Sequence, residues 1–128
     1  MESVQPSEEA ISILVTEDDK IVRNLLAAII TKKFTNVTVY LAENGRVGLE
    51  LFKCHRPQIV ITDINMPEMD GLQMVNAIRS IEAGTKILVV TAYDTSDYCK
   101  KFDKIGIEDY IVKPIAFKRL FAAIERCR

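Results

Sequence analysis

Five short apolar stretches alternate with five segments of helical periodicity, and this order constrains the fold more than any other feature of the chain. The apolar stretches are ISILV at 11–15, VTVYLA at 37–42, QIVIT at 58–62, KILVVT at 86–91 and DYIV at 109–112. Each has the length and residue types of a β-strand, and each precedes a segment with helical spacing. Strand-then-helix units in succession favour a parallel sheet covered by helices on both faces, so we expect an α/β fold.

The patterns within these segments indicate how they pack. IVI at 59–61 and ILVV at 87–90 are continuous apolar runs, typical of central parallel strands buried on both faces, whereas VTVYLA alternates and suits an edge strand. The first and last helical segments carry apolar residues at the spacing of one helix face, as in helices that pack on a sheet. These residues are Ile21, Val22, Leu25, Leu26 and Ile29 in the first segment, and Phe117, Leu120, Phe121 and Ile124 in the last.

Length and composition indicate a single soluble domain. A chain of 128 residues with 48% hydrophobic and 27% charged side chains has the size and balance of one compact domain with one core. We expect residues 1–10 to form a short polar tail and residues 11–128 to form the domain. The apolar runs fall far short of the roughly 20 residues of a transmembrane helix, and the polar, acidic first ten residues do not resemble a signal peptide. We therefore predict a cytoplasmic protein that does not contact the membrane.

Charge and cysteine content exclude several kinds of site. Seventeen basic and eighteen acidic residues leave a formal charge of −1, with no basic stripe, so we expect no direct nucleic-acid binding by this domain. Cys54, Cys99 and Cys127 are widely spaced and contain no C-x-x-C pair, which disfavours a disulfide framework and a structural zinc site. His55 is the only histidine, so a histidine-based metal cluster is also excluded.

Polar side chains stand at the carboxyl ends of four of the five predicted strands, where ligands bind in open α/β sheets. They are Glu17 and Asp18 after the first strand, Asp63 after the third, Thr91 at the end of the fourth and Lys113 after the fifth. Each alone has a structural alternative: a turn for Asp63, a helix N-cap for Thr91 and a solvated charge for Lys113. Their convergence on one edge of the sheet favours a functional site.

The acids of this set suit metal-dependent phosphoryl chemistry. Glu17, Asp18 and Asp19 are consecutive, and two unit charges about 4 Å apart repel by roughly 4 kcal/mol at an effective dielectric near 20, so a cation would relieve them. Asp19 also fits an N-cap. Three carboxylates with backbone carbonyls suit Mg²⁺. Beside such an ion a carboxylate can attack a phosphoryl group, and a lysine and a hydroxyl can hold its oxygens.

The same residues resemble the receiver domains of two-component response regulators over residues 11–127. That family has an acidic pair after its first strand, a D-x-x-M-P-x-x-D-G stretch with the phosphoacceptor, a Ser or Thr before a small residue, and a Lys-Pro pair. The matching residues here are Glu17 and Asp18, DINMPEMDG beginning at Asp63, Thr91 with Ala92, and Lys113 with Pro114. The resemblance implies a doubly wound, flavodoxin-like (CheY-like) fold with five parallel strands in the order 2-1-3-4-5 and five helices.

The resemblance also implies a role for each site residue. Asp63 would accept a phosphoryl group from a phosphohistidine of a histidine kinase or histidine phosphotransfer protein, assisted by Thr91 and Lys113. Mg²⁺, for which Mn²⁺ can substitute, would be bound by Asp18, Asp63 and the backbone carbonyl of Asn65. Glu17 would act largely through a metal-bound water. The bond between Lys113 and Pro114 would be cis, which costs only about 0.5 to 1 kcal/mol before proline.

Phosphorylation of such a domain switches a surface. Thr91 would move toward the phosphoryl group while Tyr110 turns inward, and the fourth helix, fifth strand and fifth helix would change how they meet an output domain or target protein. Five residues would modulate the site: Asn65, Met66, Ala92, Tyr93 and Pro114. Tyr93 either shields the site from water or is an ordinary surface aromatic.

Two other functions compete with this interpretation. Haloacid-dehalogenase-type phosphatases place D-x-D-x-[TV] on the first strand near the chain start. Glu17 and Asp19 have that spacing, but a glutamate would have to be the nucleophile. A pseudo-receiver would bind partners without phosphorylation. We expect a signalling switch and not an enzyme, with self-directed phosphoryl transfer and autodephosphorylation as its only chemistry.

Overall fold

The computed structural model describes residues 10–92 and 96–128, with the backbone alone at 96–99. In this part of the chain, strands and helices alternate throughout. The elements are β1 (Ile11–Thr16), α1 (Lys20–Lys33), β2 (Val37–Ala42), α2 (Gly45–His55), β3 (Ile59–Thr62), α3 (Gly71–Ile81), β4 (Lys86–Thr91), α4 (Ser96–Ile105), β5 (Asp109–Val112) and α5 (Phe117–Cys127). The five predicted strands are confirmed to within one residue at either end. The predicted tail lies outside the described residues, except for Ala10.

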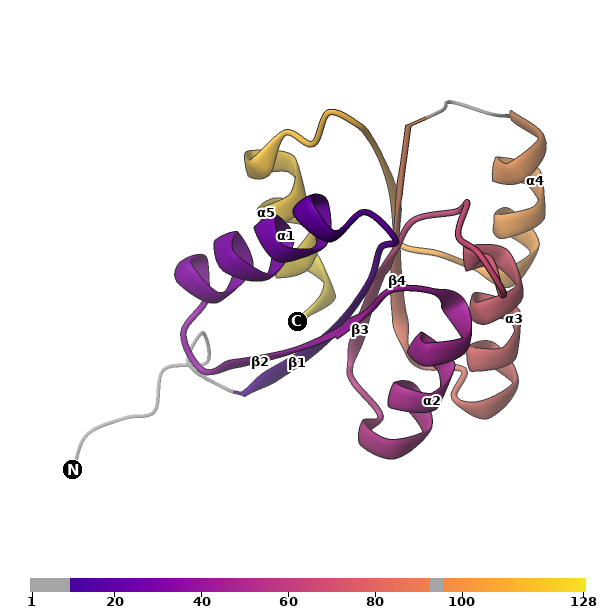
Figure 1. Cartoon of the computed structure of the whole chain (residues 1–128), viewed down its shortest axis with the longest axis horizontal. Helices are drawn as coiled ribbons and strands as arrows, with labels where there is room; N and C mark the ends of the chain where they lie inside the picture. The colour runs from indigo at the N-terminus through magenta and orange to yellow at the C-terminus, as the bar shows by residue number, and fades with distance from the viewer. Residues whose placement is uncertain (1–9, 93–95) are drawn as a thin grey trace.

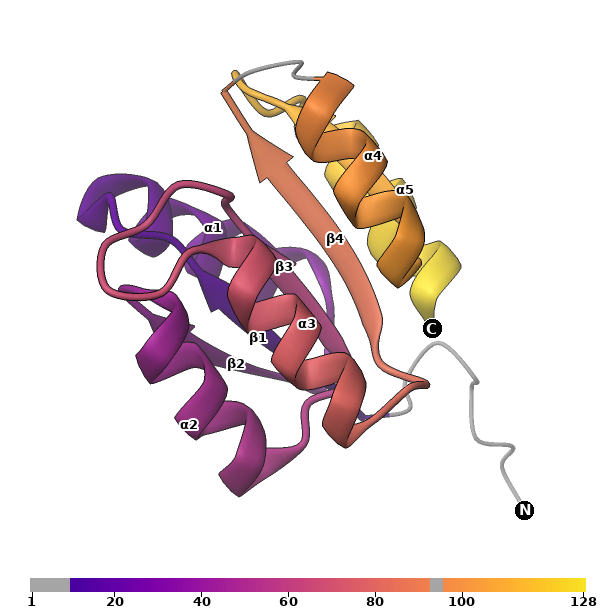
Figure 2. The ribbon, with the colours of Figure 1, turned by 90° about the vertical axis from the view of Figure 1, so that its right-hand side faces the viewer.

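The strands form one parallel sheet in the order β2-β1-β3-β4-β5, as the resemblance implied. Helices α1 and α5 cover one face, and α2, α3 and α4 cover the other (Figures 1 and 2). The strand with alternating apolar residues, β2, is an edge strand, as expected. Because the chain leaves β1 toward β2 and then returns to β3 on the other side, the order reverses between β1 and β3, and ligands bind beside such a point.

Side chains of successive strand residues point to opposite faces and build two apolar cores. Ile13 and Val15 of β1 pack with α1 and α5, whereas Leu14 packs with α2, α3 and α4, and none of the three is exposed. Ile107, just before β5, packs half-buried against the second core. None of the described helices has the length and apolar character needed to cross a bilayer.

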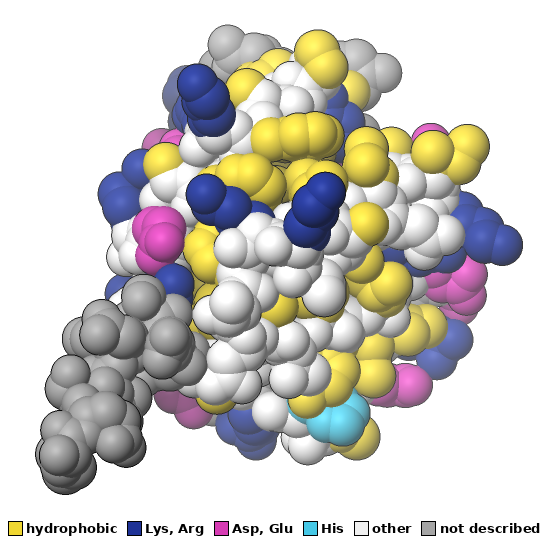
Figure 3. Space-filling view, turned by 90° about the vertical axis from the view of Figure 1, so that its left-hand side faces the viewer, with side chains coloured by type: hydrophobic (Ala, Val, Ile, Leu, Met, Phe, Trp, Pro, Cys, Tyr) yellow, Lys and Arg dark blue, Asp and Glu magenta, His cyan; other side chains and the backbone are white. Residues whose placement is uncertain are grey.

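The apolar residues of α1 and α5 are not all buried. Ile21 is 80% exposed, Leu25 46% and Phe117 41%, so only part of each predicted apolar face packs on the sheet. Successive helix residues are about 100° apart, and the stripe that meets the sheet runs through Leu26 and Ile30, both buried. Ile21 and Leu25 lie at its side. Figure 3 shows hydrophobic side chains on the outer surface of this part of the molecule, with Lys and Arg side chains among them.

Candidate functional site

The hydrogen-bonding ladder of the sheet continues past the strand ends and brings two acids together. The Glu17 N–H donates to the Ala42 carbonyl at 3.0 Å, and the Asp63 N–H donates to the Thr16 carbonyl at 3.1 Å. β1 is the neighbour of both β2 and β3, so residues just beyond these strands emerge at one place. The position of the acids therefore follows from the register of the sheet.

Glu17, Asp18 and Asp63 form a carboxylate cluster. One oxygen from each lies within 4.8 Å of the other two, as metal ligands do. Glu17 is buried, Asp63 is half-buried and Asp18 is exposed. The cluster thus has a buried wall and an open side, which suits an ion that keeps some of its waters.

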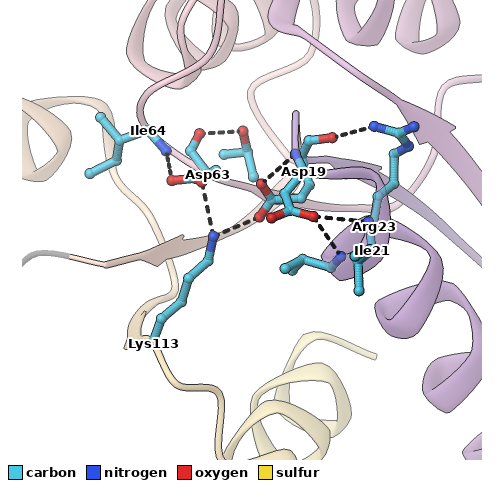
Figure 4. A network of polar contacts seen from close by, with 9 residues as sticks. Asp19, Ile21, Arg23, Asp63, Ile64 and Lys113 are labelled. Atoms are coloured by element: carbon cyan, nitrogen blue, oxygen red, sulfur yellow. Dashed lines mark hydrogen bonds and ion pairs between the residues drawn. The ribbon is translucent and has the colours of Figure 1, made fainter.

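Lys113 supplies a cation to this cluster. Its Nζ donates to Glu17 Oε1 at 2.8 Å and to Asp63 Oδ2 at 3.0 Å (Figure 4). The other oxygen of Asp63, Oδ1, accepts from the Ile64 N–H at 2.6 Å. The backbone N–H of Lys113 donates to the Thr91 carbonyl at 2.7 Å, and the bond to Pro114 is cis, as the resemblance implied. β5 and its last contact with β4 therefore aim the ammonium group at the acids.

Burial and hydrogen bonding have opposite effects on the pKa values of Glu17 and Lys113. Burial raises the pKa of the Glu17 carboxyl, although its hydrogen bonds to Lys113 and to the Asp19 N–H favour the charged form. Burial also disfavours the Lys113 ammonium, yet its hydrogen bonds to Glu17 and Asp63 outweigh burial and raise its pKa. Lys113 therefore stays protonated, and a second cation beside Glu17 would favour the carboxylate further.

Asp19 has a separate role. Its Oδ1 accepts from the N–H groups of Ile21 at 2.9 Å and Val22 at 3.2 Å, so it caps α1 and stays out of the carboxylate cluster (Figure 4). The paired acids that a haloacid-dehalogenase-type phosphatase needs on its first strand are therefore absent from this site, because Asp19 is directed to the helix.

Four further candidates lie at or just after the end of β4 or in the loop that follows β3. Thr91 is buried at the end of β4, the strand next to β3. Asn65 is exposed and Met66 is half-buried in the loop that follows Asp63. Ala92 is exposed, and Tyr93 lies outside the described residues.

Tyr110 is half-buried on β5 and faces α4. Its ring packs edge-on against Phe102 with centroids 6.1 Å apart, and its hydroxyl donates to Asp103 Oδ1 at 3.4 Å. The predicted switch residue therefore connects β5 to α4, two of the three elements of the predicted output surface.

The cluster fits a hard divalent cation. Its donors are carboxylate oxygens, without sulfur or imidazole, and Mg²⁺ prefers oxygen ligands and few protein groups. Glu17 and Asp63 also share one ammonium group, that of Lys113, so a second cation would be attracted to the cluster. The residues present could therefore hold such an ion.

Sequence reasoning missed one set of polar residues near the site. Asn44 and Arg46, at the start of α2, both donate to the carboxylate of Glu68 in the loop after Asp63. The end of β2 carried no marker comparable to those of the other strands. The Asn44-Gly45 pair, an N-cap residue before glycine, was the available signal, but its partner is far along the chain.

Known proteins are similar to this chain in sequence and in fold. The model of the response regulator receiver domain matches residues 13–125. Chemotaxis protein CheY of Bacillus subtilis is 34% identical over 114 residues, which cover 89% of this chain and 94% of that protein. The crystal structure of the N-terminal domain of an uncharacterized protein from Wolinella succinogenes superimposes with a TM-score of 0.87 at 35% identity, covering 93% of this chain and 94% of that chain.

Longer regulators are similar as well. The probable C4-dicarboxylate response regulator DctR of Priestia megaterium is 33% identical over 95% of this chain, and response regulator MprA of Mycolicibacterium vanbaalenii is 38% identical over 88%. The chain spans about half the length of these two relatives, 54% and 48%. The sheet order, the carboxylate cluster with its lysine and these likenesses agree. The chain belongs to the response regulator receiver domain family, the domain of two-component phosphorelay signalling.

Proposed function

We propose that Asp63 is the phosphoacceptor of this domain. The supporting observation is the meeting of Glu17, Asp18 and Asp63 within 4.8 Å of one another, beside the ammonium group of Lys113. In the transfer, the P–N bond of a phosphohistidine on a histidine kinase or histidine phosphotransfer protein breaks. A P–O bond forms to the Asp63 carboxylate, and the histidine nitrogen leaves with the electron pair.

Mg²⁺ is the cofactor in this proposal, with Mn²⁺ as a substitute. Asp18, Asp63 and the backbone carbonyl of Asn65 would bind the ion directly, and Glu17 would act on it indirectly. When bound, the ion offsets the negative charge that otherwise opposes attack of a carboxylate on a phosphoryl group. The oxygen-only donor set of the cluster supports this assignment.

Lys113 and Thr91 would act on the transferred group. The Lys113 ammonium, 3.0 Å from Asp63 Oδ2, can move its hydrogen bond from the carboxylate to a phosphoryl oxygen. The Thr91 hydroxyl, on the adjacent strand, can then donate to a second oxygen. Five residues next to these groups in the sequence would tune the lifetime of the acyl phosphate: Asn65 and Met66 after Asp63, Ala92 and Tyr93 after Thr91, and Pro114 after Lys113.

The phosphoryl group would switch the surface of α4, β5 and α5. Movement of Thr91 frees space into which Tyr110 turns, and its contacts with Phe102 and Asp103 would then change. An output domain or a target protein would respond to that surface. The domain, residues 11–128 after a tail at 1–10, would thus be a cytoplasmic switch whose only chemistry is its own phosphorylation and autodephosphorylation.

Incubation with acetyl phosphate or phosphoramidate and Mg²⁺, followed by intact mass measurement, tests the proposal. We expect the gain of one phosphoryl group per chain, which Asp63→Asn abolishes. Asp70→Asn is the matched control, because it makes the same change in the same loop, and asparagine can replace aspartate as the N-cap of α3. An unchanged mass, or a gain that survives Asp63→Asn, would contradict the proposal.

A further inference from the structure

The loop between β3 and α3 contains a strained turn. Glu68 adopts a φ of 67°, which is uncommon for a residue of its size. Across it, the Met69 N–H donates to the Pro67 carbonyl at 2.8 Å. This is a γ-turn with a positive central φ, a conformation that persists only where its surroundings hold it.

The start of α2 holds this turn through its side chains. The Nδ2 of Asn44, which is 2% exposed, donates to Glu68 Oε2 at 3.0 Å. The Oδ1 of Asn44 accepts from the Val47 N–H at 2.8 Å, so the same side chain caps α2. Arg46 Nε donates to Glu68 Oε1 at 3.2 Å. The Glu68 carboxylate therefore lies at the N-terminus of α2, where the helix dipole favours a negative charge.

The backbone reinforces the same contact. The Gly45 N–H donates to the Met69 carbonyl at 2.9 Å, and a Cβ at Gly45 would overlap that carbonyl oxygen. Only glycine therefore lets α2 approach the loop so closely. The Gly71 N–H also donates to the Ile64 carbonyl at 2.7 Å, which joins the two ends of the loop. The loop that begins at Asp63 is thus fixed at both ends.

Of the two donors to Glu68, the buried Asn44 should hold the loop more strongly than the exposed Arg46 does. Arg46 and Glu68 are both about half exposed, and ion pairs of that kind contribute little. Asn44 is buried and donates to a charged acceptor, a stronger type of hydrogen bond, and losing its partner would leave the amide group unpaired. Asn44 is therefore the main tie between α2 and the loop.

We propose that Asn44 is a positioning residue for the metal site, an inference that rests on the proposed function. By holding Glu68, it fixes the loop that carries the Asn65 carbonyl to the carboxylate cluster. It touches neither the metal nor the phosphoryl group. Residues that orient metal ligands in this way commonly change metal affinity about 10- to 100-fold when mutated.

An exchange of donor and acceptor tests the contact. Asn44→Asp keeps the cap of α2 but places a carboxylate against Glu68. Adding Glu68→Gln restores one donor and one acceptor in reversed order. The new amide group at position 68 can donate to the new carboxylate at position 44, while the amide oxygen accepts from Arg46. The double variant has the same net charge as the wild-type chain. Arg46→Gln, which removes only the exposed partner, is the control.

Calorimetric titration with Mg²⁺ gives the first readout. We expect Asn44→Asp to weaken Mg²⁺ binding about tenfold, the double variant to return to within about twofold of wild type, and Arg46→Gln to change it less than about twofold. A purely electrostatic effect has the opposite sign, since the added carboxylate of Asn44→Asp would strengthen cation binding. A purely structural effect would lower the melting temperature without this pattern of loss and rescue.

Amide exchange at Gly45 gives a second readout that needs no metal. We expect faster exchange in Asn44→Asp and recovery in the double variant, because that N–H donates to the loop. Wild-type affinity and exchange in Asn44→Asp would overturn the positioning role alone. A wild-type chain that binds no Mg²⁺ would overturn the proposed function, and the positioning role with it.

Discussion

Two regions border Asp63 and are built in opposite ways. On one side, the loop of residues 64–70 is held against α2 by hydrogen bonds from Asn44 to Glu68 and from the Gly45 N–H to the Met69 carbonyl. On the other side, Lys113 leads to two shallow apolar hollows between α1 and α5, of about 300 and 400 Å³, which share Phe117 and which we term the α1–α5 groove. Hydrogen bonds fix the backbone of the loop, whereas the groove exposes apolar side chains to water.

The difference separates the chemistry of the domain from its surface. Directional hydrogen bonds fix a loop in one arrangement, which a metal ligand needs. Exposed apolar side chains add little to folding, because they remove little area from water. Variants of the loop should therefore alter metal binding, and variants of the exposed groove residues Leu25 and Phe117 should leave both metal binding and stability nearly unchanged.

The largest expected effect is on the free energy of unfolding, and it should differ between two neighbouring leucines of α1. Leu26 is 2% exposed and Leu25 is 46% exposed. Leu26→Ala should lower the free energy of unfolding by about 3 kcal/mol, since it leaves a cavity in the core, whereas Leu25→Ala in the groove should cost less than about 1 kcal/mol. Urea unfolding measures both. Equal losses would mean that Leu25 contributes to stability as a core residue does, and would contradict the distinction between groove and core.

Mg²⁺ should stabilise the wild-type chain and the Asp19→Asn variant, but the Asp18→Asn variant much less. At a concentration 100 times its dissociation constant, Mg²⁺ should raise the free energy of unfolding by about 2.7 kcal/mol. Asp18→Asn should lose most of this gain, and Asp19→Asn, with the same charge change in the cap of α1, should keep it. Urea unfolding with and without Mg²⁺ distinguishes them. Equal responses of the two variants would remove Asp18 from the site.

Two glycines differ in how closely the surrounding backbone approaches them: Gly71, the first residue of α3, and Gly84, in the turn after α3. A Cβ at Gly71 would overlap the Asp63 carbonyl oxygen, whereas one at Gly84 would meet only Glu82 Oε2 at 3.7 Å. Gly71→Ala should therefore cost about 2 kcal/mol of unfolding free energy, because the backbone of the loop must shift, and should weaken Mg²⁺ binding. Gly84→Ala should be nearly neutral. A stable Gly71→Ala chain with normal Mg²⁺ affinity would show that the loop is not held rigidly.

The smallest expected effect is at Phe117 in the groove. Phe117→Ser removes an aromatic ring that is 41% exposed, and it should change stability by less than about 1 kcal/mol. Phosphorylation by acetyl phosphate should proceed at the wild-type rate, as measured by intact mass over time. A slower reaction with this small donor would tie the groove to the chemistry of Asp63.

The sequence predicted the sheet and the position of the acids, because both depend on short-range pattern. Burial on two faces produces the continuous runs of β3 and β4, and parallel strands bring their carboxyl ends to one edge. The contact between Asn44 and Glu68 could not be predicted in this way. It depends on a backbone turn at Glu68 and on the close approach of two segments that are distant in the chain.

The exposed apolar residues were missed for a related reason. Helical spacing identifies an apolar face but does not give the width of the surface that the sheet covers. Leu26 falls inside that width, while Ile21 and Leu25 fall outside it. Likewise, a lysine after a strand predicts a charge at the edge of the sheet, but only the structure shows Lys113 between Glu17 and Asp63.

Paramagnetic broadening of amide signals by Mn²⁺ tests the central claim most directly, because it locates the cation without requiring any reaction. At substoichiometric Mn²⁺, the account predicts that signals of residues 17, 18, 63 and 65 disappear first, that excess Mg²⁺ restores them, and that Asp18→Asn prevents the loss. Broadening centred on another part of the chain, or none that Mg²⁺ reverses, would contradict the claim that these acids share one divalent cation.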